Sequence, residues 1–198
     1  MVQRFAGEIC GFGTTSGVRD VIGRWTSSPI GSFADAMVEH PGGDRVLIAP
    51  SVEVAELIGG VYAFDDTIIS DVRTERLPRC LRFSGEPLAA DVTIGDRDAL
   101  GWALRCVPPA LATSVLWATI IDPVARVTMR GVRTTGRTVG GRETYSATDR
   151  RRVTAVQASW AGEDLGPLAD VVPPVRFGFS STPTRPSIVA VTTTIRPP

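Results

Sequence analysis

Hydrophobic and polar residues alternate along much of this chain, most clearly in its carboxyl-terminal third. Residues 153–160 are strand-like, residues 187–195 are dense in β-branched side chains, and Val175, Phe177 and Phe179 occupy every second position of a shorter segment. A period of two is typical of a β-strand, because successive side chains point to opposite faces. The pattern therefore predicts three strands in this part of the chain.

The same period appears in the first half of the sequence. In residues 88–94 the apolar residues occupy alternate positions, which indicates a strand with one buried and one hydrated face. Two further strand-like segments, 34–40 and 45–49, flank the sequence Pro41-Gly42-Gly43-Asp44. Proline, glycine and aspartate favour tight reversals, so we expect these two segments to form a hairpin.

A glycine-rich segment near the amino terminus, residues 11–17, has two interpretations. Apolar residues follow it at helical spacing, from Val18 to Trp25, and a glycine-rich turn before a helix can cradle a phosphate group. However, the spacing Gly-x-Gly-x-x-x-Gly departs from the dinucleotide-binding pattern, and no strand–helix alternation follows. We therefore favour a hairpin loop that leads into an ordinary strand.

Two segments have the period of a helix. After Ser51, a suitable amino-terminal cap, apolar residues recur at the spacing of one helical face until Gly59-Gly60, which predicts one short helix at about 51–60. The second segment covers about 98–121. Because Pro108-Pro109 must interrupt it, we expect two helical pieces there.

Together these elements predict a mainly β or α+β fold: an antiparallel, strongly curved sheet or barrel with one short helix (about 51–60) and a central helical insertion (about 98–121). No repeat or linker-like run divides the sequence, so residues 1–198 are expected to form a single globular domain. Acetoacetate-decarboxylase-like and lipocalin-like proteins would suit this number of strands, but no motif of either family maps onto particular residues here. The sequence therefore assigns no family.

The composition is that of a globular protein whose positively charged residues are unusual. Of the 198 residues 43% are hydrophobic, and 21 acidic residues are balanced by 21 arginines, since lysine is absent. Asparagine is absent as well, a bias typical of a GC-rich bacterial genome. The amino terminus has neither the apolar core nor the cleavage site of a secretory signal, so we expect a cytoplasmic protein with no membrane span.

The absence of lysine excludes whole classes of mechanism. Such a chain cannot form a Schiff base, anchor pyridoxal phosphate or supply the lysine of a P-loop. One histidine and three widely spaced cysteines, Cys10, Cys80 and Cys106, provide no tetrahedral set of metal ligands. We therefore expect no cofactor and no metal, and interpret each cysteine as a small buried hydrophobe.

The remaining acid–base groups are typical of solvated positions. His40 adjoins the turn at 41–44 among charged neighbours, which favours a surface histidine over a catalytic one. Three pairs of carboxylates are flanked by turn residues, as hydrated loop acids are: Asp65-Asp66, Asp96 with Asp98, and Glu163-Asp164. The sequence therefore singles out no catalytic residue.

Charge is balanced overall but unevenly distributed. Residues 31–100 contain thirteen acids and six arginines, whereas residues 126–152 contain eight arginines and two acids. One interpretation is an anion-binding face with Tyr145 available to stack and five arginines: Arg126, Arg130, Arg133, Arg137 and Arg142. The other, which we favour, is that acidic and basic strands neutralise each other across the sheet. Because the chain is neutral and few aromatic residues lie near these arginines, we expect no binding to nucleic acid.

Three functions remain. The first, which the pattern favours, is a non-enzymatic domain that binds a small, partly apolar anionic ligand in a sheet-enclosed cavity, through Arg105, Arg130, Arg133, Tyr145 and Arg176. The second is an enzyme that uses a buried carboxylate with an arginine for acid–base chemistry on an anionic substrate. The third is a homo-oligomeric assembly protein whose apolar segment from Val107 to Ile121, too short to span a bilayer, forms the subunit contact.

Overall fold

The computed structural model describes residues 2–112, 114, 117–119, 121–122, 132–138 and 141–196. Strands dominate it: β1 (Gln3–Thr14), β2 (Arg19–Ser27), β3 (Phe33–Glu39), β4 (Arg45–Ala49), β5 (Asp66–Ile69), β6 (Arg73–Leu77), β7 (Cys80–Gly85), β8 (Leu88–Ile94), β9 (Thr135–Thr138), β10 (Gly141–Trp160), β11 (Glu163–Asp164), β12 (Leu168–Ala169) and β13 (Ser187–Arg196). The helices are α1 (Val52–Gly59), α2 (Ala99–Arg105) and α3 (Pro109–Ala112), and residues 117–119 and 121–122 are also helical.

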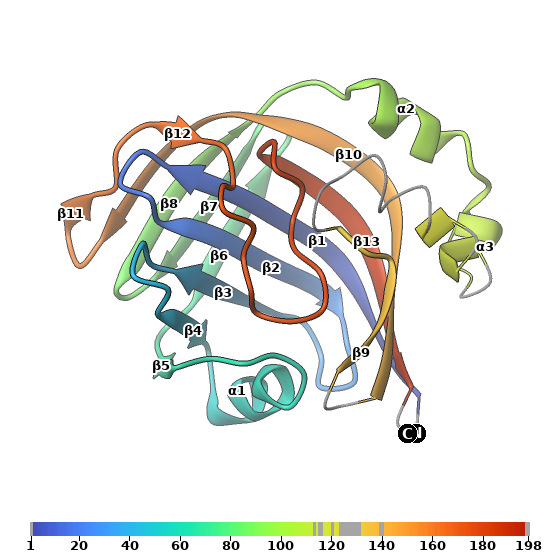
Figure 1. The fold of residues 1–198 in the computed structure, drawn as a ribbon, viewed down its shortest axis with the longest axis horizontal. Helices are drawn as coiled ribbons and strands as arrows, with labels where there is room; N and C mark the ends of the chain where they lie inside the picture. The colour runs from blue at the N-terminus through green and yellow to red at the C-terminus, as the bar shows by residue number, and fades with distance from the viewer. Residues whose placement is uncertain are drawn as a thin grey trace.

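The thirteen described strands form one sheet that curls into a half-barrel (Figure 1). Its main order is β5-β4-β3-β2-β1-β13-β10-β8-β7-β6, while β9 and β11 pair with β10, and β12 pairs with β1. The curl depends on the 20 residues of β10, which pair with β13 along the first half and with β8 along the second. The predicted curved sheet is therefore confirmed. It is mixed in one place, because α1 carries the chain back so that β4 and β5 pair in parallel.

The main hydrophobic core lies between two parts of this sheet. One face of β1 to β4 packs against β7, β8 and the second half of β10, with Phe12, Ile22, Val38, Leu81 and Ile94 fully buried there. The strand predicted at 88–94 is confirmed as β8, in which buried and exposed residues alternate along the whole length.

The first half of β10 and strands β13, β1, β2 and β3 have a second face, opposite the main core, which we call the concave face. Residues 171–183 cross this face as a loop in front of β1, β2 and β3 (Figure 1). Helix α2 lies against the part of β10 between its pairings with β9 and β8, so closely that a Cβ at Gly101 would collide with the carbonyl oxygen of Arg150. The loop and the helix together cover the concave face.

Local sequence signals account for several elements. Ser51 caps α1 by accepting a hydrogen bond from the Val54 amide, as predicted. The glycine-rich segment forms the end of β1 and the turn into β2, and the predicted hairpin at 34–49 is formed by β3 and β4. In the helical insertion, Asp98 caps α2, and α3 begins after Pro108.

The strand predicted at 175–179 is wrong, although its alternation is real. Val175 and Phe177 are buried and Arg176 and Gly178 are exposed, but no strand of the described chain pairs with this segment. It belongs to the covering loop, and its buried side chains pack against β2 and β3. An alternation of apolar and polar residues therefore shows that an extended segment is buried on one side. It does not show that the segment pairs with a neighbouring strand through backbone hydrogen bonds.

The cysteines follow the prediction only in part. Cys10 is buried, Cys80 is half-buried, and Cys106 is exposed because it stands at the carboxyl-terminal cap of α2. None of the described helices has the length and apolar composition needed to cross a bilayer.

Candidate ligand-binding cavity

The concave face and its covers surround a cavity of ≈320 Å³. Residues of β1, β2, β3, β10 and β13 form its floor, and its covers are α2, the helical residues around 118 and the loop at 175–183. Most of the lining side chains are apolar, among them Val21, Met37, Leu104, Trp117 and Val189. The interior therefore suits the apolar part of a small molecule.

Two glycines on the floor allow close approaches that a side chain would block. A Cβ at Gly11 would lie 2.6 Å from Cγ2 of Thr182, so glycine lets the covering loop approach β1. A Cβ at Gly23 would lie 2.5 Å from Oδ1 of Asp35, which accepts a hydrogen bond of 2.9 Å from the Trp25 indole. Both contacts need a residue without a side chain.

One end of the cavity carries hydrogen-bond donors that have no acceptor in the described part of the chain. Arg150 is 8% exposed, and its Nη1 lies 2.5 Å from Oδ2 of Asp98. Its Nε is buried and meets no hydrogen-bond partner in the described part of the chain. The hydroxyl groups of Ser181, Thr182 and Ser187 are also buried and without a partner among the described residues. All four residues line the cavity.

Strand register brings three of these groups together. Arg150 lies opposite Val189 on β13, and Ser187 is the preceding residue of β13 on the same face. Ser187 lies opposite Gly11 on β1, and Thr182 stands over Gly11. Because a buried polar group without a hydrogen bond costs about 1–3 kcal/mol, this arrangement can be stabilised by an acceptor group such as a carboxylate.

A second polar group of the cavity wall contains a buried carboxyl. Glu143 is 1% exposed and accepts a hydrogen bond of 2.7 Å from the Tyr62 hydroxyl, which also contacts the Tyr145 hydroxyl. Burial raises the pKa of Glu143 from 4.5 to about 7, against the lowering effect of the two phenols. Burial also raises the pKa of both tyrosines. Since Tyr62 and Tyr145 line the cavity, their hydroxyl groups connect Glu143 to it.

Arg133 is the second arginine that borders the cavity. Its backbone amide donates a hydrogen bond of 2.9 Å to Oγ of Ser180, and its Nε is buried without a partner among the described residues. The segment is anchored by Asp122, whose carboxylate accepts hydrogen bonds from the amides of Thr134 at 2.8 Å and Thr135 at 3.2 Å. Arg133 is therefore held on a fixed segment of backbone.

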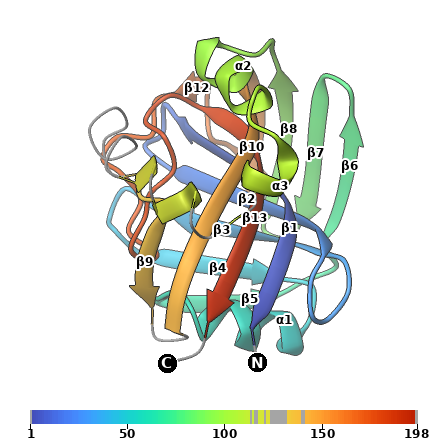
Figure 2. The same cartoon turned by 90° about the vertical axis from the view of Figure 1, so that its right-hand side faces the viewer.

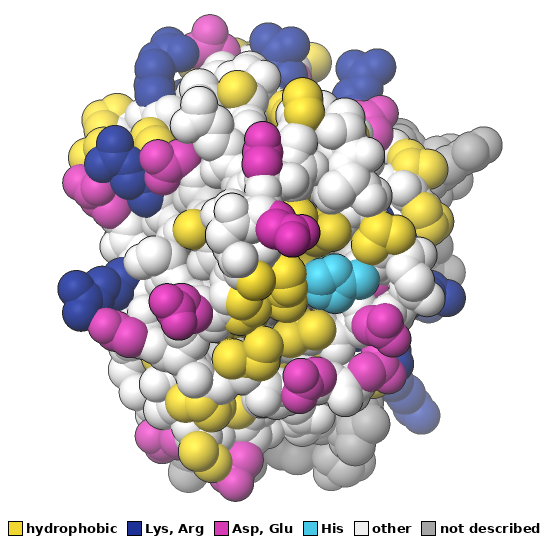
Figure 3. Space-filling model, turned by 90° about the vertical axis from the view of Figure 1, so that its left-hand side faces the viewer, with side chains coloured by type: hydrophobic (Ala, Val, Ile, Leu, Met, Phe, Trp, Pro, Cys, Tyr) yellow, Lys and Arg dark blue, Asp and Glu magenta, His cyan; other side chains and the backbone are white. Residues whose placement is uncertain are grey.

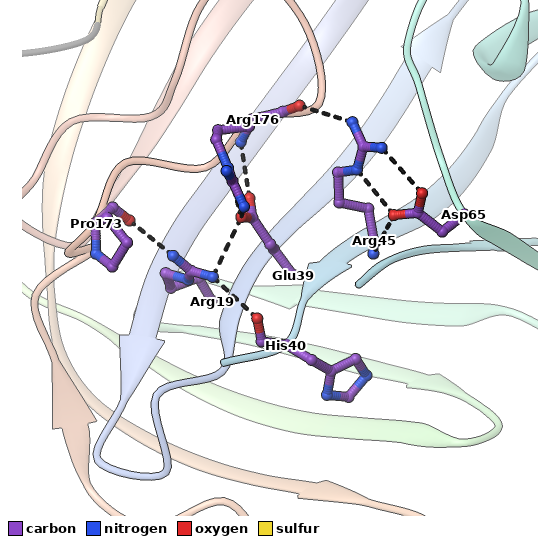
Figure 4. Close-up of polar contacts among 7 residues, drawn as sticks. All are labelled: Arg19, Glu39, His40, Arg45, Asp65, Pro173 and Arg176. Carbon is purple, nitrogen blue, oxygen red and sulfur yellow. Dashed lines mark hydrogen bonds and ion pairs between the residues drawn. The ribbon is translucent and has the colours of Figure 1, made fainter. Parts of the chain in front are cut away.

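The covering loop is fastened to the sheet by a buried ion cluster (Figure 4). Glu39, 0% exposed, accepts hydrogen bonds from the backbone amide of Arg176 at 2.8 Å and from its Nε at 3.1 Å. Arg19 lies 3.3 Å from the same carboxylate and donates to the carbonyl oxygens of Pro173 and His40. One carboxylate and one guanidinium thus hold two points of the loop to the ends of β2 and β3.

Of the five residues predicted to bind a ligand, two line the cavity and two of the others do not. Arg133 and Tyr145 line the cavity. Arg105 is exposed at the end of α2, and Arg176 belongs to the ion cluster with 69% of its side chain exposed, so neither is a lining residue. Arg130 lies outside the described residues.

The sequence pattern does not reveal Arg150 and Glu143 as groups of the cavity wall. Both lie on β10, where the alternation is clear only from Val153 onward because charged residues fill the first half. The one available signal lies on the carboxyl-terminal side: extending the period backwards from Val153 places Arg150 on the face opposite Val153, whereas extending it forwards from Tyr145 does not, because a bulge lies between them.

The acidic pairs and the apolar segment singled out in the sequence have other surroundings. Asp65 is exposed and bound by Arg45, whose hydrogen bonds lower the pKa of Asp65. Glu163-Asp164 is exposed in β11. Within the segment from Val107 to Ile121, several described residues line the cavity, so part of its apolar surface faces inward.

His40 lies half-buried at the surface. Its ring meets that of Trp160 edge-on, with centroids 4.6 Å apart. Figure 3 shows the histidine beside a group of hydrophobic side chains with acids around them. It is not a lining residue of the cavity.

No protein-family model and no curated protein matches the chain. Among solved structures, it is similar to an acetoacetate decarboxylase from Legionella pneumophila, with a TM-score of 0.45 and 9% identity over 100% of this chain and 86% of that one. It is also similar to a putative AttH from Nitrosomonas europaea, with a TM-score of 0.30 and 11% identity over 98% of this chain and 50% of the other. Likenesses this remote identify neither a family nor an activity.

Proposed function

We propose that the protein binds a small, predominantly apolar molecule that carries an anionic or other hydrogen-bond-accepting group. The observation that carries the proposal is a group of donors at one end of an apolar cavity that have no partner among the described residues: Nε of Arg150 and the hydroxyls of Thr182 and Ser187. An acceptor oxygen of the ligand would satisfy these donors, and its apolar part would contact the remaining wall. The role proposed is binding.

The size and charge of the cavity narrow the class of ligand. Its ≈320 Å³ is near the lower end of small-molecule sites, about 300–1,000 Å³. At about 0.8 kcal/mol per buried methylene, a chain of eight carbons would gain about 6 kcal/mol before the entropic costs of binding. Arg150 is paired with Asp98 and offers a directed hydrogen bond, whereas Arg133 has no ion pair in the described part and supplies net positive charge.

The test is a titration with eight-carbon probes that differ in their polar group. Trp25 and Trp117 line the cavity, so their fluorescence reports its occupancy. Octanoate should bind about tenfold more tightly than octanol, because two hydrogen bonds to a charged acceptor are worth at least about 1.4 kcal/mol together. A variant with both Thr182→Val and Ser187→Ala should lose most of this preference and keep its affinity for octanol.

The control is Thr93→Val, on the exposed face of β8, which should leave both affinities unchanged. Native mass spectrometry of freshly purified protein should detect a retained small molecule. Equal affinity for octanoate and octanol, or no fluorescence response to either, would overturn the proposal.

A second candidate function, acid–base catalysis, is favoured by Glu143. Its pKa of about 7 lies where a general acid or base works best near neutral pH, and two phenols connect it to the cavity. A suitable probe is 2-oxo-octanoate in D2O, with NMR to follow deuterium uptake next to the ketone. Uptake that is faster than in buffer and absent in Glu143→Gln would support catalysis; uptake at the buffer rate excludes it for this class of compound.

A further inference from the structure

Four exposed arginines lie close together on the outer face of the sheet, where β9, β10, β13 and β1 are neighbours (Figure 2). Arg142 on β10 lies directly opposite Arg137 on β9 and directly opposite Arg196 on β13. Arg4 on β1 lies opposite Thr194, which shares a face with Arg196 two residues further along. We call these four residues the arginine face.

No acid neutralises the arginine face within the described part of the chain. Ten other arginines form ion pairs with Asp or Glu there, as Arg97 does with Asp149 at 2.7 Å. Glu8, which lies on the same face of β1, is already bound by Arg24 and Arg76. The four cations are therefore left without counter-charges, whereas ten of the nineteen described arginines have one.

This arrangement costs stability unless an anion occupies it. Like charges directly opposite each other on neighbouring strands destabilise a sheet, and here three stand in a row at a strand spacing of about 4.8 Å. A row of threonines runs beside them: Thr135, Thr144 and Thr194 lie opposite one another on the same three strands. At the β9 edge, Arg137, Arg142, Arg133 and Thr135 border a hollow.

We propose that the arginine face binds an oligophosphate, either the phosphoryl chain of a nucleotide or a free polyphosphate. Guanidinium groups bind phosphate oxygens through paired N–H donors, and successive phosphoryl groups offer one anionic centre to each arginine of the row. The hydroxyls of Thr135 and Thr194 can donate to the remaining oxygens. This second site is independent of the cavity, since only Arg133 borders both.

The test is calorimetric titration with tripolyphosphate, orthophosphate and citrate at low salt. Tripolyphosphate should bind at least tenfold more tightly than citrate, which offers carboxylates in place of phosphoryl groups, and orthophosphate should bind most weakly. A variant with both Arg137→Gln and Arg142→Gln should lose about tenfold or more of the affinity for tripolyphosphate. This variant should keep its tryptophan fluorescence response to octanoate. The two measurements therefore test the phosphate site and the proposed ligand-binding cavity separately.

The matched control is Arg73→Gln, an exposed arginine of β6 paired with Asp71, which should bind tripolyphosphate as the parent does. Comparing ATP with tripolyphosphate distinguishes the sources: tighter binding of ATP indicates a nucleotide, and equal binding indicates recognition of the phosphates alone. Equal losses in Arg73→Gln and in the double variant, or citrate bound as tightly as tripolyphosphate, would show unspecific attraction and overturn the proposal.

Discussion

Asp20 is a buried acid whose removal gives a sharp prediction about stability. It lies on β2 opposite Phe12 and Val38, all three residues are fully buried, and neither carboxylate oxygen has a hydrogen-bond partner in the described chain. Burial raises the pKa of Asp20 from 3.8 to about 7. The folded protein therefore keeps a proton at this position that the unfolded chain releases.

This difference makes the free energy of unfolding depend on pH. Below pH 3.8 both states hold the proton, and the contribution of Asp20 to stability is fully present. As the pH rises toward 7, only the unfolded chain ionises, so unfolding becomes easier by about 1.4 kcal/mol per pH unit. Between pH 5 and pH 7 Asp20 alone should remove about 2.3 kcal/mol of stability, and only about 0.4 kcal/mol more is lost above pH 7.

Urea unfolding at pH 5 and pH 8, followed by tryptophan fluorescence, measures this effect. The free energy of unfolding of the parent chain should fall between these pH values by about 3 kcal/mol more than that of Asp20→Asn, because an amide cannot ionise. Glu163→Gln, an exposed acid of β11, should behave like the parent. The reasoning would be refuted by the same pH dependence in Asp20→Asn and the parent.

Three further substitutions test the cover and the wall of the cavity. Gly11→Ala should lower the free energy of unfolding in urea by about 1–3 kcal/mol, because the added Cβ would lie 2.6 Å from Cγ2 of Thr182. An unchanged free energy would mean that the covering loop moves away from β1 without cost. Glu39→Gln should cost about 3–5 kcal/mol in the same assay, since the buried Arg19 would lose its counter-charge, and a loss below about 1 kcal/mol would contradict this role. Glu143→Gln should weaken the infrared band of protonated carboxyl groups at pH 6, because the pKa of Glu143 is about 7; an unchanged band would place that pKa much lower.

The strands that could be predicted are those with one face in the core and one in water. β8 is such a strand, and its alternation in sequence is also its alternation in burial. The helix at 52–59 could be predicted as well, since its cap, its apolar face and its glycine stop are all local signals. The sequence predicts that the sheet is curved but not how it curves, because the curvature depends on the pairing of β10 with two strands that are far apart in the sequence.

β2 shows why the buried acids could not be predicted. One of its faces packs into the core that includes β7 and β8, and the other is covered by the loop near Val175. Both covers come from distant parts of the sequence, so no local pattern reveals that the strand is buried on two sides. Asp20 on β2 and Asp35 on the adjacent β3 have the spacing of water-facing strand acids, yet both are buried, and burial raises the pKa of each to about 7.

The direction of Arg150 depends on a β-bulge in β10. Tyr145 and Ala147 line the cavity, and uninterrupted alternation would bring Asp149 to the wall next. The register shifts between Ala147 and Asp149, so that Arg150 lies opposite Val189 on the concave face, while Asp149 is bound by Arg97 outside the cavity. One extra residue thus places a cation at the cavity wall where regular pairing would place a carboxylate. The contribution of Arg150 to the proposed recognition of an acceptor group depends on that shift in register.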